Sequence, residues 1–257
     1  MAVRLTILGS GTSHGIPMIA CDCRVCTSDD PRDKRTRTSA LFSFHDHHVL
    51  IDTGPELRLQ CIRSDVRRVD ALFYTHHHAD HVVGLDDVRR FNAIARGPLP
   101  LHANRRTLDA LAAMFPYAFS HDPTYPSHKP LLTAVEVGPP FELFGRRVTP
   151  IPYYHGELPV LGVRIGDVAY CPDCNRMPED SRRLLRGLDV LVLDALRRTP
   201  HPTHFNIEQA IDEARRIDAQ RTYFTHIAHE ILHAETEAEL PDGIRLAYDG
   251  LVCESPG

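Results

Sequence analysis

The chain has 257 residues, of which 42% are hydrophobic and 25% charged, the composition of a globular protein large enough to bury a sizeable core. Its formal net charge of -5 argues against a protein that binds nucleic acid through bulk positive charge. The apolar run near the amino terminus is too short for a signal peptide or a membrane span, so we expect a cytoplasmic protein that does not engage a membrane.

The first third of the sequence is typical of β-structure, because short apolar runs alternate with turn residues. The strands expected there span residues 3–8, 39–44, 48–51 and 70–75, and the second and third of these predict a hairpin. Apolar residues between positions 82 and 91 then recur at mostly helical spacings. Asp80 is suited to cap the start of that helix.

The second half of the chain continues the same mixture of strands and helices. A helix is expected over residues 107–114, followed by a long connecting loop over residues 116–130, and another helix is expected over residues 207–217. The strands expected here span residues 133–137, 147–151, 160–165, 168–170, 190–193 and 221–225. Two β-rich halves with helices predict an α/β fold, a four-layer αββα sandwich of two facing sheets with helices outside. No linker-like stretch divides residues 1–257, so we expect a single domain.

Histidine is unusually frequent, with 17 residues, and metal-binding side chains gather at one strand-to-helix junction. These side chains are His76, His78, Asp80 and His81. Side chains two positions apart point the same way, so the strand end can aim His76 and His78 together, while the other two lie in the first helical turn. One loop can thus supply four ligands to two nearby metal ions, as two-metal hydrolysis requires. The alternative is a solvated, histidine-rich loop, which the density of ligands argues against.

The pattern His-x-His-x-Asp-His at this junction resembles the signature of the metallo-β-lactamase superfamily, and the resemblance continues over nearly the whole chain. It implies the metallo-β-lactamase fold and three further ligands near predicted strand ends, namely His155, Asp173 and His226. It also implies that one metal ion is held by His76, His78 and His155, and the other by Asp80, His81 and His226. Asp173 would bridge the two ions together with a water or hydroxide. Two adjacent dications lower the pKa of that water and stabilise charge on a phosphoryl oxygen.

Seven cysteines are an odd number, and three of them form the compact motif Cys21-x-Cys23-x-x-Cys26. Clustered thiols in a reducing compartment indicate metal binding more than disulfides, and three suit one tetrahedral zinc ion. His229, expected at a helix start, is the natural fourth ligand, with three reduced structural cysteines as the alternative. The motif, together with a terminal Thr-His-x-x-His, resembles the phosphoribosyl 1,2-cyclic phosphate phosphodiesterase branch of the superfamily. The resemblance implies a structural zinc that ties an amino-terminal loop to a carboxy-terminal one.

Two further residues are candidates for catalytic roles. Asp194 also ends an apolar strand and rivals Asp173 for the bridging position, but the order of ligands in the family favours Asp173. We therefore expect Asp194 to orient a ligand or a proton donor. His204 matches a further histidine of the same branch and would donate a proton to the leaving oxygen or stabilise the phosphoryl group. The alternative is a surface histidine beside a helix start.

Other features leave alternatives open. Cys171 and Cys174 flank the expected bridging aspartate, where a second zinc or a redox pair competes with simple packing, which we favour. The charged run over residues 29–37 is expected to be solvated, with a phosphate contact by Arg35 or Arg37 as the alternative. No role is assigned to His14, which could line the pocket, or to His233, which we expect at the surface.

The ligand set predicts a metal-dependent phosphoric diester hydrolase that cleaves a small cyclic phosphate or phosphodiester by attack of a metal-bound hydroxide. The expected cofactors are two divalent ions, zinc or manganese, at the active site and one structural zinc. A tRNA 3′-processing endonuclease is a rival, against which the acidic balance and the lack of a basic insertion argue. The other rivals are a lactone or thioester hydrolase of the same fold and a non-catalytic metal-binding protein of cofactor biosynthesis. A homodimer is common for such folds.

Overall fold

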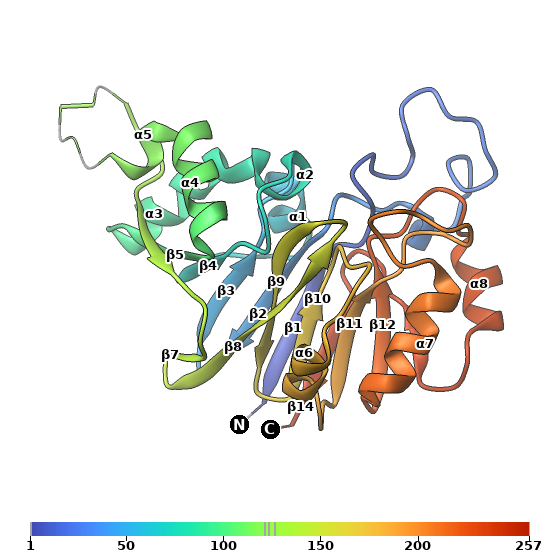
Figure 1. Cartoon of the computed structure of the whole chain (residues 1–257). Helices are drawn as coiled ribbons and strands as arrows, with labels where there is room; N and C mark the ends of the chain where they lie inside the picture. The colour runs from blue at the N-terminus through green and yellow to red at the C-terminus, as the bar shows by residue number, and fades with distance from the viewer. Residues whose placement is uncertain (1, 121, 123, 126, 257) are drawn as a thin grey trace.

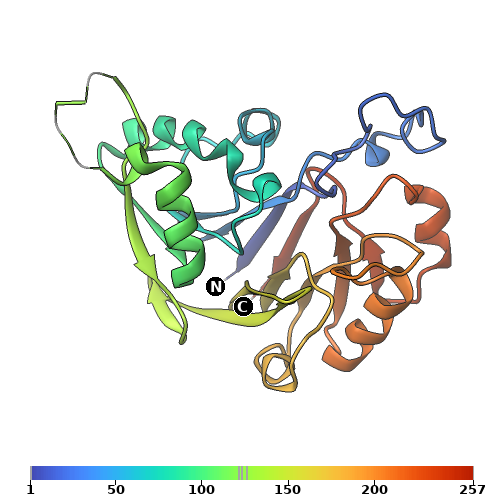
Figure 2. The ribbon, with the colours of Figure 1, turned by 45° about the horizontal axis from the view of Figure 1, so that its top comes forward.

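Two β-sheets packed face to face form the centre of the molecule, and helices cover both outer faces (Figures 1 and 2). The computed structural model describes residues 2–120, 122, 124–125 and 127–256. Apolar side chains of both sheets, such as Leu5 and Phe42 from one and Val163 and Val192 from the other, meet in a shared core. One further apolar cluster lies between each sheet and the helices that cover it. The predicted four-layer αββα sandwich is therefore confirmed.

The first sheet combines the amino-terminal half of the chain with its last strand. In spatial order its strands are β14 (Val252–Ser255), β1 (Val3–Gly9), β2 (Ser39–Phe44), β3 (His47–Ile51), β4 (Ala71–Phe73), β5 (Leu99–Ala103) and β6 (Leu132–Glu136). The predicted hairpin of β2 and β3 is confirmed, and β3 to β6 run parallel to one another. The sequence pattern does not reveal β5 or β14.

The second sheet comes from the remaining part of the chain. In spatial order its strands are β13 (Ile244–Leu246), β12 (Arg221–Thr225), β11 (Val190–Asp194), β10 (Val168–Cys171), β9 (Leu158–Ile165), β8 (Arg146–His155) and β7 (Phe141–Leu143). Strands β10 to β13 are parallel, and β9 is antiparallel to both of its neighbours, so β8 runs in the same direction as β10. The carboxyl ends of β8, β10, β11 and β12 therefore lie at one edge of the sheet.

Helices of the amino-terminal half cover the first sheet, and those of the carboxy-terminal half cover the second (Figure 1). The first group is α1 (Leu57–Arg63), α2 (Ala79–Val82), the 3-10 helix η2 (Val83–Val88), α3 (Arg89–Ala95), α4 (Arg105–Met114) and α5 (Pro116–Phe119). The second group is α6 (Glu179–Leu184), α7 (Ile207–Ile217) and α8 (His233–Glu239), and a 3-10 turn, η1, spans Pro31–Asp33. None of the described helices is long and apolar enough to cross a membrane.

The helix expected from Asp80 onwards is wrong in two respects. It is three consecutive segments, α2, η2 and α3, and His78 rather than Asp80 is the residue that precedes its first turn. Within η2, Gly84 packs against Gly54 so closely that a Cβ there would lie 2.1 Å from the Gly54 carbonyl oxygen. In the loop expected over residues 116–130, α5 forms the first turn, and residues 121, 123 and 126 lie outside the described part of the chain.

Candidate metal centre

Side chains from both sheets converge at the edge where the parallel strands end. His76 and His78 follow β4, and Asp80 and His81 lie in α2 directly behind them. From the second sheet come His155 at the end of β8, Asp173 two residues after β10 and His226 directly after β12. All seven side chains predicted as ligands are thus brought to one place.

Three histidines form the first group. The ligand atoms of His76, His78 and His155 lie within 4.8 Å of one another. The ring centroid of His78 is 4.6 Å from that of His76 and 5.0 Å from that of His155. Burial lowers the pKa of His76 well below its ordinary value, which keeps this imidazole neutral. Neutral imidazole is the form that binds a metal ion.

A carboxylate stands between this group and a second one. The ligand atoms of Asp80, His81, Asp173 and His226 also lie within 4.8 Å of one another. Asp173 Oδ1 is 3.2 Å from His81 Nε2, and Asp173 Oδ2 is 3.3 Å from His226 Nε2. The same Oδ2 is 3.9 Å from His76 Nε2 in the first group. Asp173 therefore occupies the position between two clusters that a bridging carboxylate requires.

The buried polar atoms of the cluster favour metal ions as their missing partners. Among the described residues, Nε2 of His76, His81 and His226 and Oδ1 of Asp173 are buried without a hydrogen-bond partner. Buried polar groups are nearly always hydrogen-bonded, so unpartnered atoms aimed at one another need an explanation. Imidazole nitrogen with carboxylate oxygen suits zinc, manganese and related divalent ions. The residues present therefore fit a dinuclear site.

Asp52, which the sequence pattern does not single out, holds the cluster from behind. This fully buried residue follows β3, and its Oδ2 accepts hydrogen bonds from His81 Nδ1 at 2.7 Å and from the Thr75 hydroxyl at 2.7 Å. Thr75 Oγ1 in turn lies 3.0 Å from His76 Nδ1. One carboxylate thus orients a histidine of each group, leaving Nε2 of both rings to face the metal positions. Its place at a strand end, like that of Asp173, is the only sequence signal for it.

The charge of His81 depends on its carboxylate neighbours. Burial disfavours the imidazolium, but Asp173, Asp80 and Asp52 together raise the pKa of His81 well above its ordinary value. In the absence of a metal ion, a proton on His81 offsets part of this negative charge. Metal binding must displace that proton, so metal affinity falls as the pH is lowered.

Asp194 lies behind two other histidines and not between the metal positions. Its side chain is fully buried, and Oδ1 lies 2.9 Å from His204 Nδ1 and 3.7 Å from His226 Nδ1. Its Oδ2 accepts a hydrogen bond from the backbone N–H of Phe205 at 2.9 Å. This placement agrees with an orienting role for Asp194 and with Asp173 as the bridging carboxylate.

His204 reaches the cluster from the loop after β11. Its ring centroid is 4.5 Å from those of both His155 and His226, and it is buried, unlike a surface histidine. Since Nδ1 faces Asp194, the other ring nitrogen is free to act at the site. Burial lowers the pKa of His204, whereas the negative charges of Asp173 and Asp80 oppose that shift.

The predicted second metal cluster also assembles. The ligand atoms of Cys21, Cys23, Cys26 and His229 lie within 4.8 Å of one another, and His229 Nδ1 is 3.4 Å from the sulfurs of both Cys21 and Cys23. These separations suit ligands around one tetrahedral zinc ion. Burial opposes ionisation of Cys23, but hydrogen bonds from the Cys26 backbone and from His229 lower its pKa to about 6. A thiolate is the form that zinc binds.

Several expectations around this second cluster are wrong. His229 lies in a turn, and the helix that follows, α8, begins only at His233, which is buried rather than exposed. The charged run over residues 29–37 is not fully solvated, because Arg35 is buried and paired with Asp33 at 2.9 Å. This pair packs on the carboxy-terminal segment through a hydrogen bond from Arg35 to the carbonyl of Ile231 at 2.9 Å, so Arg35 has no freedom to bind phosphate.

The remaining predicted residues have simpler surroundings. Cys171 and Cys174 are fully buried, free thiols within the apolar core beneath the second sheet, which agrees with packing. Arg37 is half-buried and paired with Glu56. His14 is exposed in the first loop.

Comparisons with known proteins agree with this geometry. A family model for the beta-lactamase superfamily domain matches residues 47–227. The crystal structure of a diphosphatase from the PhnP family is 44% identical, with a TM-score of 0.93, and covers 99% of this chain and 98% of that one. Zn(2+)-bound PqqB from Methylobacterium extorquens has a TM-score of 0.78 over 97% of this chain and 99% of that one, and its 22% identity supports the fold alone.

One curated relative is much longer than this chain. An octanoyltransferase of Porphyromonas gingivalis is 39% identical over 254 residues, which are 97% of this chain but 51% of that protein. The chain thus spans about half the length of this relative.

Proposed function

Because the chain belongs to the metallo-β-lactamase superfamily, in its PhnP-like branch, we propose that this metal-dependent hydrolase cleaves a small phosphodiester or cyclic phosphate. One observation carries the proposal, namely the convergence of seven ligand side chains with a buried Asp194–His204 pair beside them. A dinuclear site alone serves many hydrolyses, and the additional histidine supplies what cleavage of a phosphate ester needs.

Some residues of the site bind and orient the metal ions, and another transfers a proton. When bound, two adjacent divalent ions lower the pKa of a water molecule and neutralise charge on phosphoryl oxygens. Asp173 would contribute a ligand to both ions. Asp52 holds His81 and, through Thr75, His76 in the ring orientation that keeps Nε2 inward. This network preorganises the ligands, so little rearrangement is needed when substrate arrives.

His204 is the proposed proton donor to the leaving oxygen. Its Nδ1 hydrogen bond to Asp194 stabilises the imidazolium and leaves the Nε2 proton available for transfer. An anionic phosphoryl group in the site adds negative charge near the ring, which favours its protonated form. The leaving group departs far more readily as a neutral alcohol than as an alkoxide, so this residue matters most for substrates with poor leaving groups.

The similarity to a PhnP-family diphosphatase also supports phosphoryl chemistry, whereas the other relatives support less. The activity of the octanoyltransferase cannot be carried over, because this chain spans about half of that protein. A non-catalytic, purely metal-binding role is opposed by the complete ligand set.

We further propose that the ions at the active site are zinc or manganese and that the cysteine cluster holds a structural zinc. The cluster joins residues more than 200 positions apart, because Cys21 and Cys23 meet His229. Its role is to fasten the amino-terminal loop beside the carboxy-terminal segment that carries His226, where the two lie side by side in Figure 1.

The test is a substrate panel on the purified, metal-loaded protein. The panel contains bis-p-nitrophenyl phosphate, a 2′,3′-cyclic nucleotide, an alkyl diphosphate, a lactone and a pre-tRNA. We expect cleavage of the phosphate esters, and a loss of at least about 100-fold in Asp80→Ala and His78→Ala. His47→Ala, which alters a histidine stacked on Phe144, is the matched control and should leave turnover unchanged. Rapid lactone turnover without diester cleavage would falsify the proposal.

A further inference from the structure

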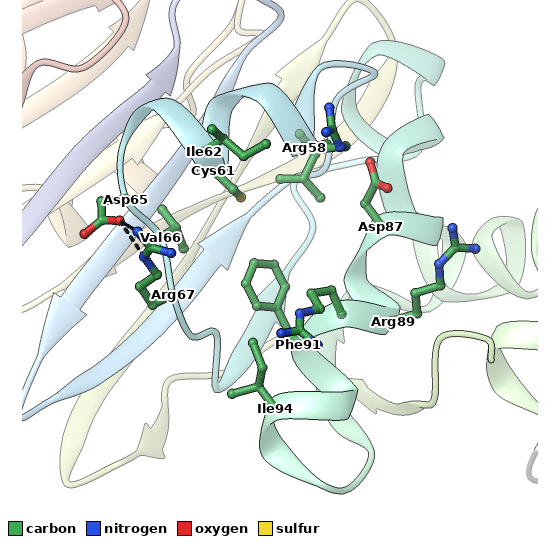
Figure 3. A pocket seen from close by; sticks show the side chains of 12 residues that line it. Arg58, Cys61, Ile62, Asp65, Val66, Arg67, Asp87, Arg89, Phe91 and Ile94 are labelled. Atoms are coloured by element: carbon green, nitrogen blue, oxygen red, sulfur yellow. Dashed lines mark hydrogen bonds and ion pairs between the residues drawn. The ribbon is translucent and has the colours of Figure 1, made fainter.

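A groove on the outer helix layer lies apart from both metal clusters. It has a volume of about 520 Å³ and runs between α1 and α3 (Figure 3). Figure 3 shows Phe91 and Ile94 of α3 on the side opposite Cys61 and Ile62 of α1. The groove takes no part in the chemistry proposed above, so its features need a separate explanation.

The walls of the groove are apolar and unusually exposed. Phe91 and Cys61 are buried and form its base, with exposed fractions of 6% and 8%. Above them, Ile62 is 63% exposed and Ile94 is 40% exposed. Such a group of large apolar side chains at the surface of a folded protein marks an interaction site.

Positive charge surrounds this apolar centre. A second hollow of about 580 Å³ adjoins the groove and shares Arg89 and Arg90 with it. Among the residues that the structure describes, six lysine or arginine side chains and two aspartates line the two hollows, although the whole chain carries a net charge of -5. Arg67 pairs with Asp65, and Arg89 pairs with Asp86.

Two of these arginines have no protein partner. Arg58 on α1 and Arg90 on α3 are exposed and make no hydrogen bond or ion pair with any of the residues that the structure describes. They stand on opposite walls of the groove, so an occupant lying along it can meet a guanidinium group on each side. Guanidinium groups of this kind pair best with carboxylates.

We propose that this groove docks an acidic amphipathic helix of a partner protein. Two helices with an apolar cleft between them form a common receptor for a third helix, whose apolar residues recur every three to four positions. The occupant's leucine-like side chains would pack on Ile62 and Ile94, and its flanking carboxylates would meet Arg58 and Arg90. Because the groove is positively charged, the partner segment must be negatively charged.

Other occupants fit less well. A second copy of this chain, docked by the same surface, would set the arginines of one copy against those of the other. Single-stranded nucleic acid uses exposed aromatic rings for stacking, whereas Phe91, the groove's aromatic ring, is buried. The exposed isoleucines would also bury no apolar surface against a charged sugar-phosphate backbone.

The walls of the groove are continuous with the loops of the metal centre. Helix α1 begins five residues after Asp52, and η2 and α3 directly follow the segment that carries His76 to His81. The two segments touch where Gly84 meets Gly54. A docked partner would therefore sit on helices that directly adjoin the segments carrying the ligands, without covering the ligands themselves.

The test uses a fluorescent 18-residue peptide, with leucine at helical spacing and glutamate at most other positions, added to the metal-loaded protein. Its anisotropy is compared with that of a scrambled peptide and of a peptide with lysine in place of glutamate. We expect saturable binding of the acidic peptide, at least about tenfold tighter than either control, and weaker binding as salt rises.

Variants locate the binding site. The double variant Arg58→Glu/Arg90→Glu and the variant Ile62→Glu should each weaken binding of the acidic peptide at least about tenfold. Arg147→Glu on the second sheet and Met114→Glu on α4, where Met114 is 45% exposed, are the matched controls and should bind as the wild type does. Turnover of the diester substrate reports that every variant is folded.

Three results would overturn the proposal. One is equal binding of the glutamate and lysine peptides, and another is binding that the groove variants do not change. The third is occupation of the groove by a different molecule. Sedimentation would reveal a second copy of the chain as a concentration-dependent dimer that Ile62→Glu abolishes. Binding of single-stranded RNA or of decanoate to the groove, without binding of the acidic peptide, would likewise overturn the proposal.

Discussion

Replacement of Asp52 by asparagine perturbs the metal centre without touching a ligand. The shape of the side chain is kept, but the Oδ2 that accepts hydrogen bonds from His81 and Thr75 becomes an amide nitrogen that only donates. The backbone N–H of Thr75, 2.8 Å from Oδ1, can keep its acceptor. His81 Nδ1 must then give up its proton to face the amide, and the neutral ring carries its proton on Nε2, where it blocks metal binding.

The size of the effect follows from this change of tautomer. Loss of a hydrogen-bond partner behind a metal-binding histidine typically weakens metal affinity by about 10- to 100-fold, which corresponds to about 1.4–2.8 kcal/mol. The ion held by Asp80, His81 and His226 should leave first, because only His81 contacts Asp52 directly. His76 is one hydroxyl group further away, through Thr75, and its ion should be affected less.

Chelator competition and metal analysis measure this prediction. The affinity for each ion is titrated in wild-type and Asp52→Asn protein, and diester cleavage is followed at limiting and at excess metal. We expect activity to fall with metal occupancy and to recover partly when metal is added, which a purely structural defect would not show. Asp70→Asn is the control, since Asp70 accepts a backbone hydrogen bond from His48 at the opposite end of β4. Affinities of both ions within twofold of wild type would refute the reasoning.

Two further substitutions separate the proton donor from the structural cluster. His204→Ala should keep all metal ions yet lower kcat about 100- to 10,000-fold for substrates with an alkoxide leaving group, and much less for p-nitrophenyl esters. An equal loss for both kinds of leaving group would contradict its role as proton donor. Cys23→Ser should lose one zinc per chain and lower the unfolding temperature by at least about 4 °C, while the active-site ions stay bound. An unchanged metal count would eliminate the cysteine cluster as a zinc site.

The local signals in the sequence were strong where ligands and strands coincide. The run from His76 to His81 predicts a metal-binding loop, because ligand residues at these spacings rarely occur together by chance after a buried strand. Apolar runs also locate most strands, and α7 begins and ends at the predicted residues. The layers follow from these elements, since each sheet must bury two faces.

Residues whose importance depends on distant neighbours escaped prediction. Asp52 is one aspartate after one strand, and only the approach of His81, 29 positions later, gives it a role. The burial of Arg35 likewise depends on the carboxy-terminal segment folding over it, which no local pattern reveals. Helix α1 is not among the predicted elements, although its buried residues Leu57, Gln60 and Cys61 have the spacing of one helix face.

The backbone conformation at the strand ends helps to hold the ligand side chains in one place. Asp52, Asp173 and His226 all have positive φ angles, of 58°, 52° and 60°, at or near the ends of β3, β10 and β12. A residue other than glycine held in this left-handed region costs on the order of 1–3 kcal/mol and persists only where its surroundings enforce it. Here the enforcing structure is the pair of buried sheets, whose strands cannot shift without exposing their shared core. Glycine at these positions would relieve the strain but remove the ligand or its support, so some stability is given up to keep the site in its binding geometry.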